Sequence, residues 1–183
     1  QPCFAHFVRD AAPGLGWLVV TDTDNGAPAA ADVSGFEPFS ALSGDPATLT
    51  ERPHDPMAHF GIQYTSGTTA RPKAVLWTHA NALWGAKINA VHQELRPEDV
   101  HQIYLPLFHT NALAYSMLAS LWVGCTAVIQ PRFSASRFWS TALEHRSTWT
   151  SLVPFCVKAL MEREVPKNHH FRLWGSAICE PPT

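Results

Sequence analysis

One stretch decides the fold of this chain: Tyr64-Thr65-Ser66-Gly67-Thr68-Thr69-Ala70-Arg71-Pro72-Lys73-Ala74-Val75. Short apolar runs flank it at 60–63 and 75–77, so we predict two strands joined by a loop. Gly67 gives the loop the freedom to turn several backbone N–H groups toward one anion, and Lys73 adds a positive charge. The hydroxyls that add further donors belong to Thr65, Ser66, Thr68 and Thr69. The pattern indicates a phosphate-binding loop; the alternative is an ordinary Ser/Thr-rich hairpin turn.

The loop is of a particular kind. It lacks the Gly-x4-Gly-Lys-Ser/Thr spacing of P-loop NTPases, which excludes that class. It closely resembles the phosphate-binding motif of the adenylate-forming (acyl-CoA synthetase / AMP-binding) superfamily, Tyr-Thr-Ser-Gly-Thr-Thr-Gly-x-Pro-Lys-Gly-Val. This chain has Ala70 and Ala74 where glycine is commonest, and a left-handed φ at either position would strain alanine by about 1 kcal/mol or more. The sequence that follows, Trp77-Thr78-His79-Ala80-Asn81, is most similar to the carnitine/crotonobetaine-CoA ligase branch.

From residue 58 onward, strand and helix patterns alternate. A helix is predicted where Ala80, Trp84, Ile88, Val91 and Leu95 repeat at helical spacing, with Thr78 as its cap. The other predicted helices cover 111–122, from Ser134 and 155–164, and the predicted strands cover 101–105, 125–129, 148–153 and 171–174. This alternation predicts an α/β fold with a mainly parallel sheet and helices on both faces. We expect the loop at 65–73 at the carboxyl edge of that sheet, where such folds bind ligands.

The chain is predicted to have three parts. Residues 1–22 form an N-terminal remnant with a short helix and a strand, and 23–57 form a loop rich in Pro, Gly and Ala. Residues 58–183 form the ATP-binding α/β unit. The resemblance implies a piece of the large N-terminal domain of a much longer enzyme. The C-terminal domain and its catalytic lysine are expected outside these 183 residues, so the piece alone is expected to be inactive.

Composition excludes several function classes. Hydrophobic residues make up 46% of the 183, enough for a core, and the net charge of −2 offers no basic footprint for nucleic acid. The apolar run 112–123 is too short to span a bilayer. The four cysteines (Cys3, Cys125, Cys156 and Cys179) are scattered without a Cys-x-x-Cys pair, so we expect reduced thiols and a cytoplasmic protein. The oligomeric state is left open.

A second informative stretch is Leu105-Pro106-Leu107-Phe108-His109-Thr110-Asn111-Ala112. It places a histidine just past a predicted strand, at the start of a helix that is apolar nearly all round and therefore expected to be buried. The resemblance implies that His109 borders the acyl-substrate pocket and orients the carboxylate, with Thr110 and Asn111 lining the pocket. The alternative is a helix-start histidine whose partners are backbone groups.

A third stretch, Leu173-Trp174-Gly175-Ser176-Ala177-Ile178, runs from a strand into small residues, which let a flat ring approach the backbone. The resemblance implies that Gly175, Ser176 and Ala177 form the shelf for adenine. The family's segment is usually richer in glycine.

Other chemistries have weaker support. The ten histidines form no His-Glu-x-x-His or Cys/His metal cluster, and no Gly-x-Ser-x-Gly or Ser-x-x-Lys motif indicates a hydrolase. The resemblance implies an ATP-dependent acyl-CoA ligase that uses ATP, Mg²⁺, coenzyme A and a carboxylic acid, with Lys73 and His109 as catalytic residues and Thr65 beside the metal. The alternative, motivated by Ala70 and Ala74, is a non-catalytic ATP- or acyl-binding module.

Overall fold

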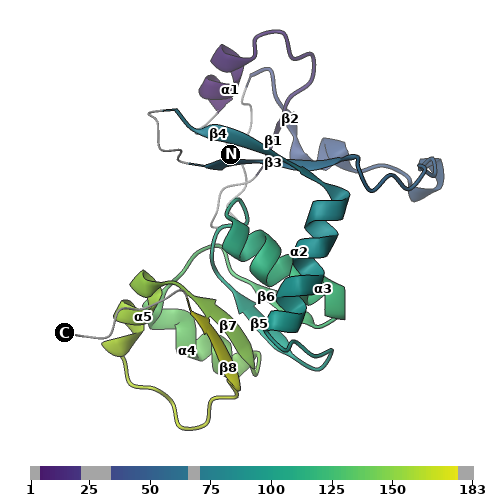
Figure 1. The fold of residues 1–183 in the computed structure, drawn as a ribbon. Helices are drawn as coiled ribbons and strands as arrows, with labels where there is room; N and C mark the ends of the chain where they lie inside the picture. The colour runs from purple at the N-terminus through teal and green to yellow at the C-terminus, as the bar shows by residue number, and fades with distance from the viewer. Residues whose placement is uncertain (1–4, 22–33, 66–70, 177–183) are drawn as a thin grey trace. The chain divides into compact units, whose positions relative to one another are not determined.

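The computed structural model describes residues 5–21, 34–65 and 71–176. The chain divides into two compact units, Gln1–Pro53 and His54–Thr183, and each is described by itself (Figure 1).

The first unit is small. Its elements are helix α1 (Ala5–Ala11), strands β1 (Val19–Val20) and β2 (Glu37–Pro38), and the 3₁₀ turns η2 (Phe39–Leu42) and η3 (Pro46–Thr48). β1 and β2 pair in parallel. The predicted helix and strand of the N-terminal part are confirmed in shorter form. Ala5 and Val20 are its buried hydrophobic residues within the described ranges.

The second unit begins with a β-hairpin. Strand β3 (His59–Thr65) pairs antiparallel with β4 (Lys73–Thr78), and the two form a sheet of their own. The two predicted strands and the connecting loop are therefore confirmed. The expectation that the loop follows a strand of the parallel sheet is wrong, because its flanking strands belong to this hairpin. The hairpin exposes apolar side chains, with Ile62 60% and Leu76 48% exposed.

The parallel sheet has the strand order β6-β5-β7-β8. Its strands are β5 (Val100–Ile103), β6 (Thr126–Ile129), β7 (Trp149–Leu152) and β8 (Leu173–Ser176), each within two residues of its predicted start. All three pairings are parallel. The chain leaves β5 toward one edge and then crosses to β7 and β8 on the other side. The connections therefore change direction beside β5, which makes the carboxyl end of β5 a topological switch point.

Helices cover both faces of this sheet (Figure 1). They are α2 (His79–His92), the π-helix η4 (Asn111–Leu118), α3 (Ala119–Val123), α4 (Ala135–Glu144) and α5 (Pro154–Met161). Two separate buried clusters mark the two faces. One joins α4 and α5 to Leu152, and the other joins α2 and α3 to Trp149. Because Trp149 and Leu152 are three residues apart on β7, their side chains point to opposite faces. The predicted fold class is confirmed.

Two helices differ in detail from their predictions. The cap of α2 is confirmed, since Thr78 and Asn81 form a reciprocal capping box. The buried face of α2, however, consists of Ala82, Ala86 and Ala90, while three large apolar residues of the predicted stripe (Trp84, Ile88 and Val91) are exposed. Leu95, the last residue of that stripe, is buried as predicted, just beyond the end of the helix. Small side chains let α2 approach η4 closely. The helix predicted at 111–122 is η4 followed by α3, and it is buried on one side only, because Leu121 is 62% exposed.

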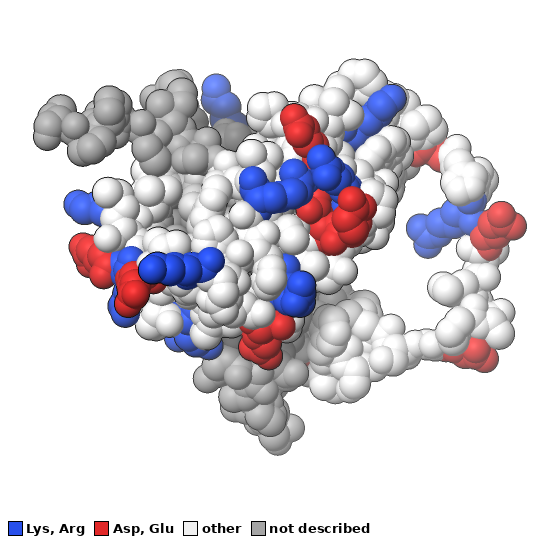
Figure 2. Space-filling model, turned by 90° about the horizontal axis from the view of Figure 1, so that it is seen from below, with Lys and Arg blue, Asp and Glu red and all other residues white. Residues whose placement is uncertain are grey.

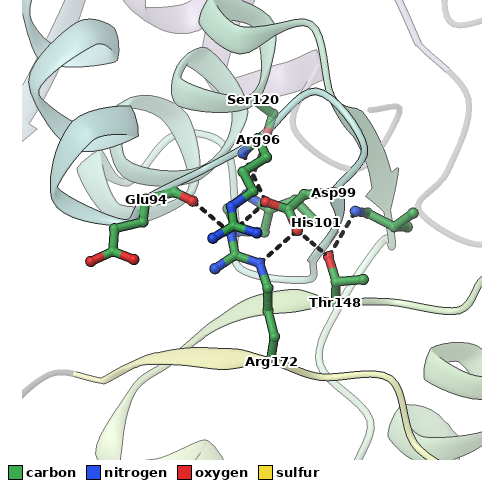
Figure 3. Close-up of polar contacts among 8 residues, drawn as sticks. Glu94, Arg96, Asp99, His101, Ser120, Thr148 and Arg172 are labelled. Atoms are coloured by element: carbon green, nitrogen blue, oxygen red, sulfur yellow. Dashed lines mark hydrogen bonds and ion pairs between the residues drawn. The ribbon is translucent and has the colours of Figure 1, made fainter.

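A polar cluster holds the amino-terminal ends of the parallel strands together (Figure 3). Asp99, which precedes β5, is 3% exposed. Its carboxylate accepts hydrogen bonds from the Arg172 guanidinium (Nε, 2.8 Å), the Thr148 hydroxyl (2.7 Å) and the Arg96 amide (2.8 Å). Arg172 also donates to the carbonyl of Glu94 at 2.7 Å. Since Thr148 precedes β7 and Arg172 precedes β8, one carboxylate connects three strands.

Candidate functional site

The base of the phosphate-binding loop lies at the end of the hairpin. Thr65 and Lys73 are paired across β3 and β4, and both are exposed. The pairing places a hydroxyl and an ammonium-bearing side chain at the two ends of the intervening loop. Ser66, Gly67, Thr68 and Thr69 lie outside the described residues, as does Ala70. Their predicted contacts with phosphate therefore stay predictions.

Ala74 is not strained. It lies in β4 opposite Tyr64, and the left-handed φ angles of described non-glycine residues occur at Glu94 and Arg146. The strain considered for alanine at this position of the motif is therefore absent here. Extended backbone accommodates alanine as readily as glycine.

His109 follows the carboxyl end of β5, at the switch point of the parallel sheet. Its backbone amide donates to Pro106 at 2.9 Å, and its carbonyl accepts from the Leu113 amide at 3.0 Å. These bonds fix the turn that carries the side chain into η4. The imidazole is exposed and lies 4.6 Å from the Phe108 ring, centroid to centroid.

Gln63 connects the hairpin to the turn that carries His109. Its amide nitrogen donates to the Phe108 carbonyl at 3.2 Å, and its amide oxygen accepts from the Thr110 hydroxyl at 2.9 Å. A carbonyl can only accept a hydrogen bond, so the NH₂ group must face Phe108 and the oxygen must face Thr110. Sequence reasoning missed this residue, because a glutamine in an alternating strand is typical of a solvated face.

A groove of about 300 Å³, here called the β3 groove, lies between the hairpin and the turn after β5. Most of its lining is apolar or aromatic: Phe60, Gly61, Ile62, Tyr64, Trp77, Leu107, Phe108 and Leu113, with Gln63 and His109 as polar members. His109 thus borders a groove, whereas Thr110 and Asn111 are outside its lining. Thr110 instead bonds to Gln63, and the Asn111 side-chain oxygen is buried without a partner among the described residues.

Gly175 lies buried in β8, where its small size has a packing reason. A Cβ atom on Gly175 would stand 2.3 Å from the Trp149 indole and 3.1 Å from the Tyr115 ring. The flat ring that approaches this backbone on the Cβ side is therefore the protein's own Trp149. Ser176 ends β8, and Ala177 lies outside the described residues.

Buried titratable groups in the second unit serve the core. Burial lowers the pKa of His101 to about 3, although the nearby Asp99 charge opposes the shift. Its imidazole is therefore neutral at pH 7, with Nδ1 2.9 Å from the Ser120 hydroxyl. Burial also raises the pKa of the Cys156 thiol, which keeps that residue protonated.

Charge and metal-ligand distributions give no further candidate site. In the face drawn in Figure 2, basic and acidic side chains are interspersed rather than gathered by sign. Within the described ranges, no group of three His, Cys, Asp or Glu side chains is arranged to hold a metal ion. No helix among those residues is long and apolar enough to cross a membrane.

The family model for "AMP-binding enzyme" matches residues 12–181. Crotonobetaine/carnitine--CoA ligase of Shigella flexneri serotype 5b is 32% identical over 170 residues, which cover 91% of this chain and 32% of the relative. The ligase of the same name from Escherichia fergusonii is 31% identical over 177 residues, covering 93% and 33%. The chain thus spans about a third of the length of these curated relatives.

Two solved structures superpose on most of this chain. O-succinylbenzoate coenzyme A synthetase (MenE) from Bacillus subtilis, in complex with AMP, superposes with a TM-score of 0.61 at 30% identity, over 70% of this chain and 26% of that one. MbtA from Mycobacterium smegmatis gives a TM-score of 0.77 over 98% of this chain and 32% of its own length. Its 24% identity supports the fold alone.

Proposed function

Because the chain belongs to the AMP-binding enzyme family, we propose that the protein is an ATP-dependent acid–CoA ligase. It activates a carboxylic acid as acyl-AMP and then transfers the acyl group to coenzyme A. Relatives named crotonobetaine/carnitine--CoA ligase, at 31–32% identity, support this reaction. The residues of the second unit supply the nucleotide side of the site.

The observation that carries the proposal is the hairpin that pairs Thr65 with Lys73. In the first step a carboxylate oxygen attacks the α-phosphorus of ATP, and pyrophosphate leaves. A carboxylate must approach a polyanion, so the step depends on neutralising phosphate charge. Lys73 and the N–H groups of the 66–69 loop supply that neutralisation. In the second step the thiolate of coenzyme A attacks the acyl carbon, and AMP leaves.

Magnesium fits this site as a companion of ATP. Mg²⁺ commonly binds through substrate phosphates and water with few protein ligands, and it would spread the negative charge of the leaving pyrophosphate. Thr65 offers one exposed hydroxyl oxygen for it. The described residues offer no acidic cluster that would hold the ion without the nucleotide.

The remaining assignments concern the acid and adenine. His109 orients the substrate carboxylate at the mouth of the β3 groove, and Thr110 and Asn111 support the turn behind it. Gly175, Ser176 and Ala177 form the adenine shelf. We assign the whole of 58–183 to the ATP-binding unit, and the scattered cysteines support a cytoplasmic location.

A second candidate function is a non-catalytic ATP- or acyl-binding module. The observation that favours it is the pair of alanines, Ala70 and Ala74, at positions where the motif usually has glycine. Extended backbone at Ala74 weakens this candidate, and Ala70 lies outside the described residues.

Acid-dependent exchange of pyrophosphate into ATP tests both candidates in the full protein. The ligase predicts exchange with at least one carboxylic acid. It also predicts a loss on the order of 100-fold in Lys73→Ala, the size typical for removing one group that stabilises transition-state charge. The matched control is Lys158→Ala, which removes an exposed lysine from α5. ATP binding without exchange for any acid would establish the module instead.

A further inference from the structure

The β3 groove contains no charged side chain. Its described lining is apolar and aromatic apart from Gln63 and His109, and includes no Lys, Arg, Asp or Glu. Its volume of about 300 Å³ and this composition match the lower end of small-molecule sites, which combine apolar walls with a few polar groups. A second negative charge on a bound acid would lie against apolar and aromatic side chains without gaining a partner, which is costly.

The strand register gives the groove a direction. Thr65, paired with Lys73 at the base of the phosphate loop, has its side chain on the same face of β3 as Gly61 and Gln63. On this face of β3, Gly61 is the lining residue farthest from the loop, and it is paired with Trp77, which also lines the groove. A carboxylate placed near the phosphates therefore directs its acyl chain along this face, past Gln63 and toward Gly61.

We propose that the β3 groove selects acids whose apolar acyl chain carries no second negative charge, and that Gly61 sets the longest chain it accepts. The inference rests on the proposed function for the identity of the ligand. It goes beyond that function by naming the substrate class and a specificity-determining residue.

Gly61 is suited to this role because a side chain there would enter the groove without disturbing the fold. A Cβ atom at Gly61 meets no described atom within 4 Å. Residues 61 and 63 point to the same face of β3, and the Gln63 side chain on that face bonds to the turn that forms the opposite wall. A larger residue at 61 therefore fills the far end of the groove.

The walls of the groove are fixed by the same glutamine. The two hydrogen bonds of Gln63 hold the Phe108 and Thr110 backbone turn at a set distance from β3. A wall held in place can discriminate chain length, because the cavity does not widen to admit a longer ligand at no cost.

The test is equilibrium dialysis of labelled straight-chain saturated acids, from butanoic to dodecanoic, against the full protein and its Gly61→Leu variant. Each buried methylene strengthens binding about fourfold, so a leucine that displaces three of them weakens long acids roughly 50-fold. Butanoic acid should bind both proteins within about twofold, because it does not reach Gly61. Octanedioic acid should bind the wild type at least about tenfold more weakly than octanoic acid, because its second carboxylate lies against apolar side chains that offer it no partner.

Two further variants keep the test decisive. Trp77→Ala enlarges the same end and should shift the preference toward longer acids, the reverse of Gly61→Leu. Gly44→Leu, whose Cβ also meets no described atom and which does not line the groove, should leave all affinities unchanged. Equal loss for short and long acids, no loss, or equal binding of the two octane acids would overturn the inference. Length-dependent binding without pyrophosphate exchange would overturn only the proposed function.

Discussion

Replacing Arg172 by alanine is expected to open the amino-terminal edge of the parallel sheet. The guanidinium donates to both oxygens of the Asp99 carboxylate and to the Glu94 carbonyl. Without it, a carboxylate that is 3% exposed keeps only the Thr148 hydroxyl and the Arg96 amide as donors. Burial by itself raises the pKa of Asp99, but the bonds from Arg172, Thr148 and Arg96 outweigh it and lower that pKa. Asp99 is therefore ionised in the native protein, and removing Arg172 leaves this buried charge with fewer hydrogen-bond donors.

The size of the effect follows from the exposure of the two partners. Breaking a buried ion pair by removing one partner costs about 3 to 5 kcal/mol. Because the Arg172 side chain is 27% exposed, water can enter the vacated site and solvate Asp99 in part. We therefore expect a loss of about 2 to 3 kcal/mol, equivalent to roughly 30- to 150-fold in the opening equilibrium. Arg172→Lys keeps the positive charge but loses the paired N–H donors of the guanidinium, and should lower the free energy of opening by about 1 kcal/mol.

Native-state hydrogen exchange of the full protein measures this loss locally. The reporters are the Val100 amide, which donates to the Thr148 hydroxyl, and the Thr148 amide, which donates to the Val100 carbonyl. Their exchange should accelerate by the factor given above, whereas amides of the β3–β4 hairpin should not respond. Arg163→Ala, an exposed arginine beyond α5, is the matched control.

Two results would refute the reasoning. One is exchange at Val100 and Thr148 that stays within about threefold of the control. The other is additivity: if the losses from Asp99→Ala and Arg172→Ala simply sum in the double variant, the two side chains are not coupled.

Three further predictions concern single residues. Gly175→Ala should lower the urea midpoint by the equivalent of about 2 kcal/mol, because its Cβ would stand 2.3 Å from the indole of Trp149. Adding Trp149→Phe should recover part of that loss. An unchanged midpoint in Gly175→Ala would contradict the close packing of Gly175 against Trp149. Thr78→Ala should cost about 1 kcal/mol and speed exchange in the first turn of α2, whereas Thr78→Ser should not; equal effects would contradict the cap. For His101 the native pKa of about 3 lies below the ordinary 6.5, so the unfolded chain binds the extra proton and stability falls as pH is lowered from 6.5 toward 3. Urea titrations at stepped pH should show this slope reduced in His101→Gln, and an unchanged slope would exclude His101 as its source.

The elements of the second unit were predictable because each is encoded locally. The Tyr64–Val75 motif and its apolar flanks predict two strands and a loop, and the family resemblance that it carries is confirmed by the match over residues 12–181. Strand partners are not encoded locally, because the pattern of one strand does not state which other strand lies beside it. For that reason the loop was wrongly expected to follow a strand of the parallel sheet.

The buried face of α2 shows a second limit. Large apolar residues at helical spacing predict a core-facing stripe, yet the alanine face is buried because only small side chains allow η4 to come so close. The site shows a third limit. Thr65 and Lys73 could be identified from the motif. The roles of Gln63 and Gly61 depend on a turn more than 40 residues away in the sequence, and so they could not be predicted from the strand pattern.

The Asp99 cluster also has a consequence for how the protein is made. Arg172 follows Asp99 by 73 residues. At translation rates of about 5 to 20 residues per second, the ribosome needs roughly 4 to 15 seconds to add that stretch. During this interval the carboxylate has no arginine, and β8 does not yet exist. β8 can therefore join β7 only after it has left the ribosome, and a pause in synthesis before Arg172 would prolong the life of an intermediate in which Asp99 has no arginine.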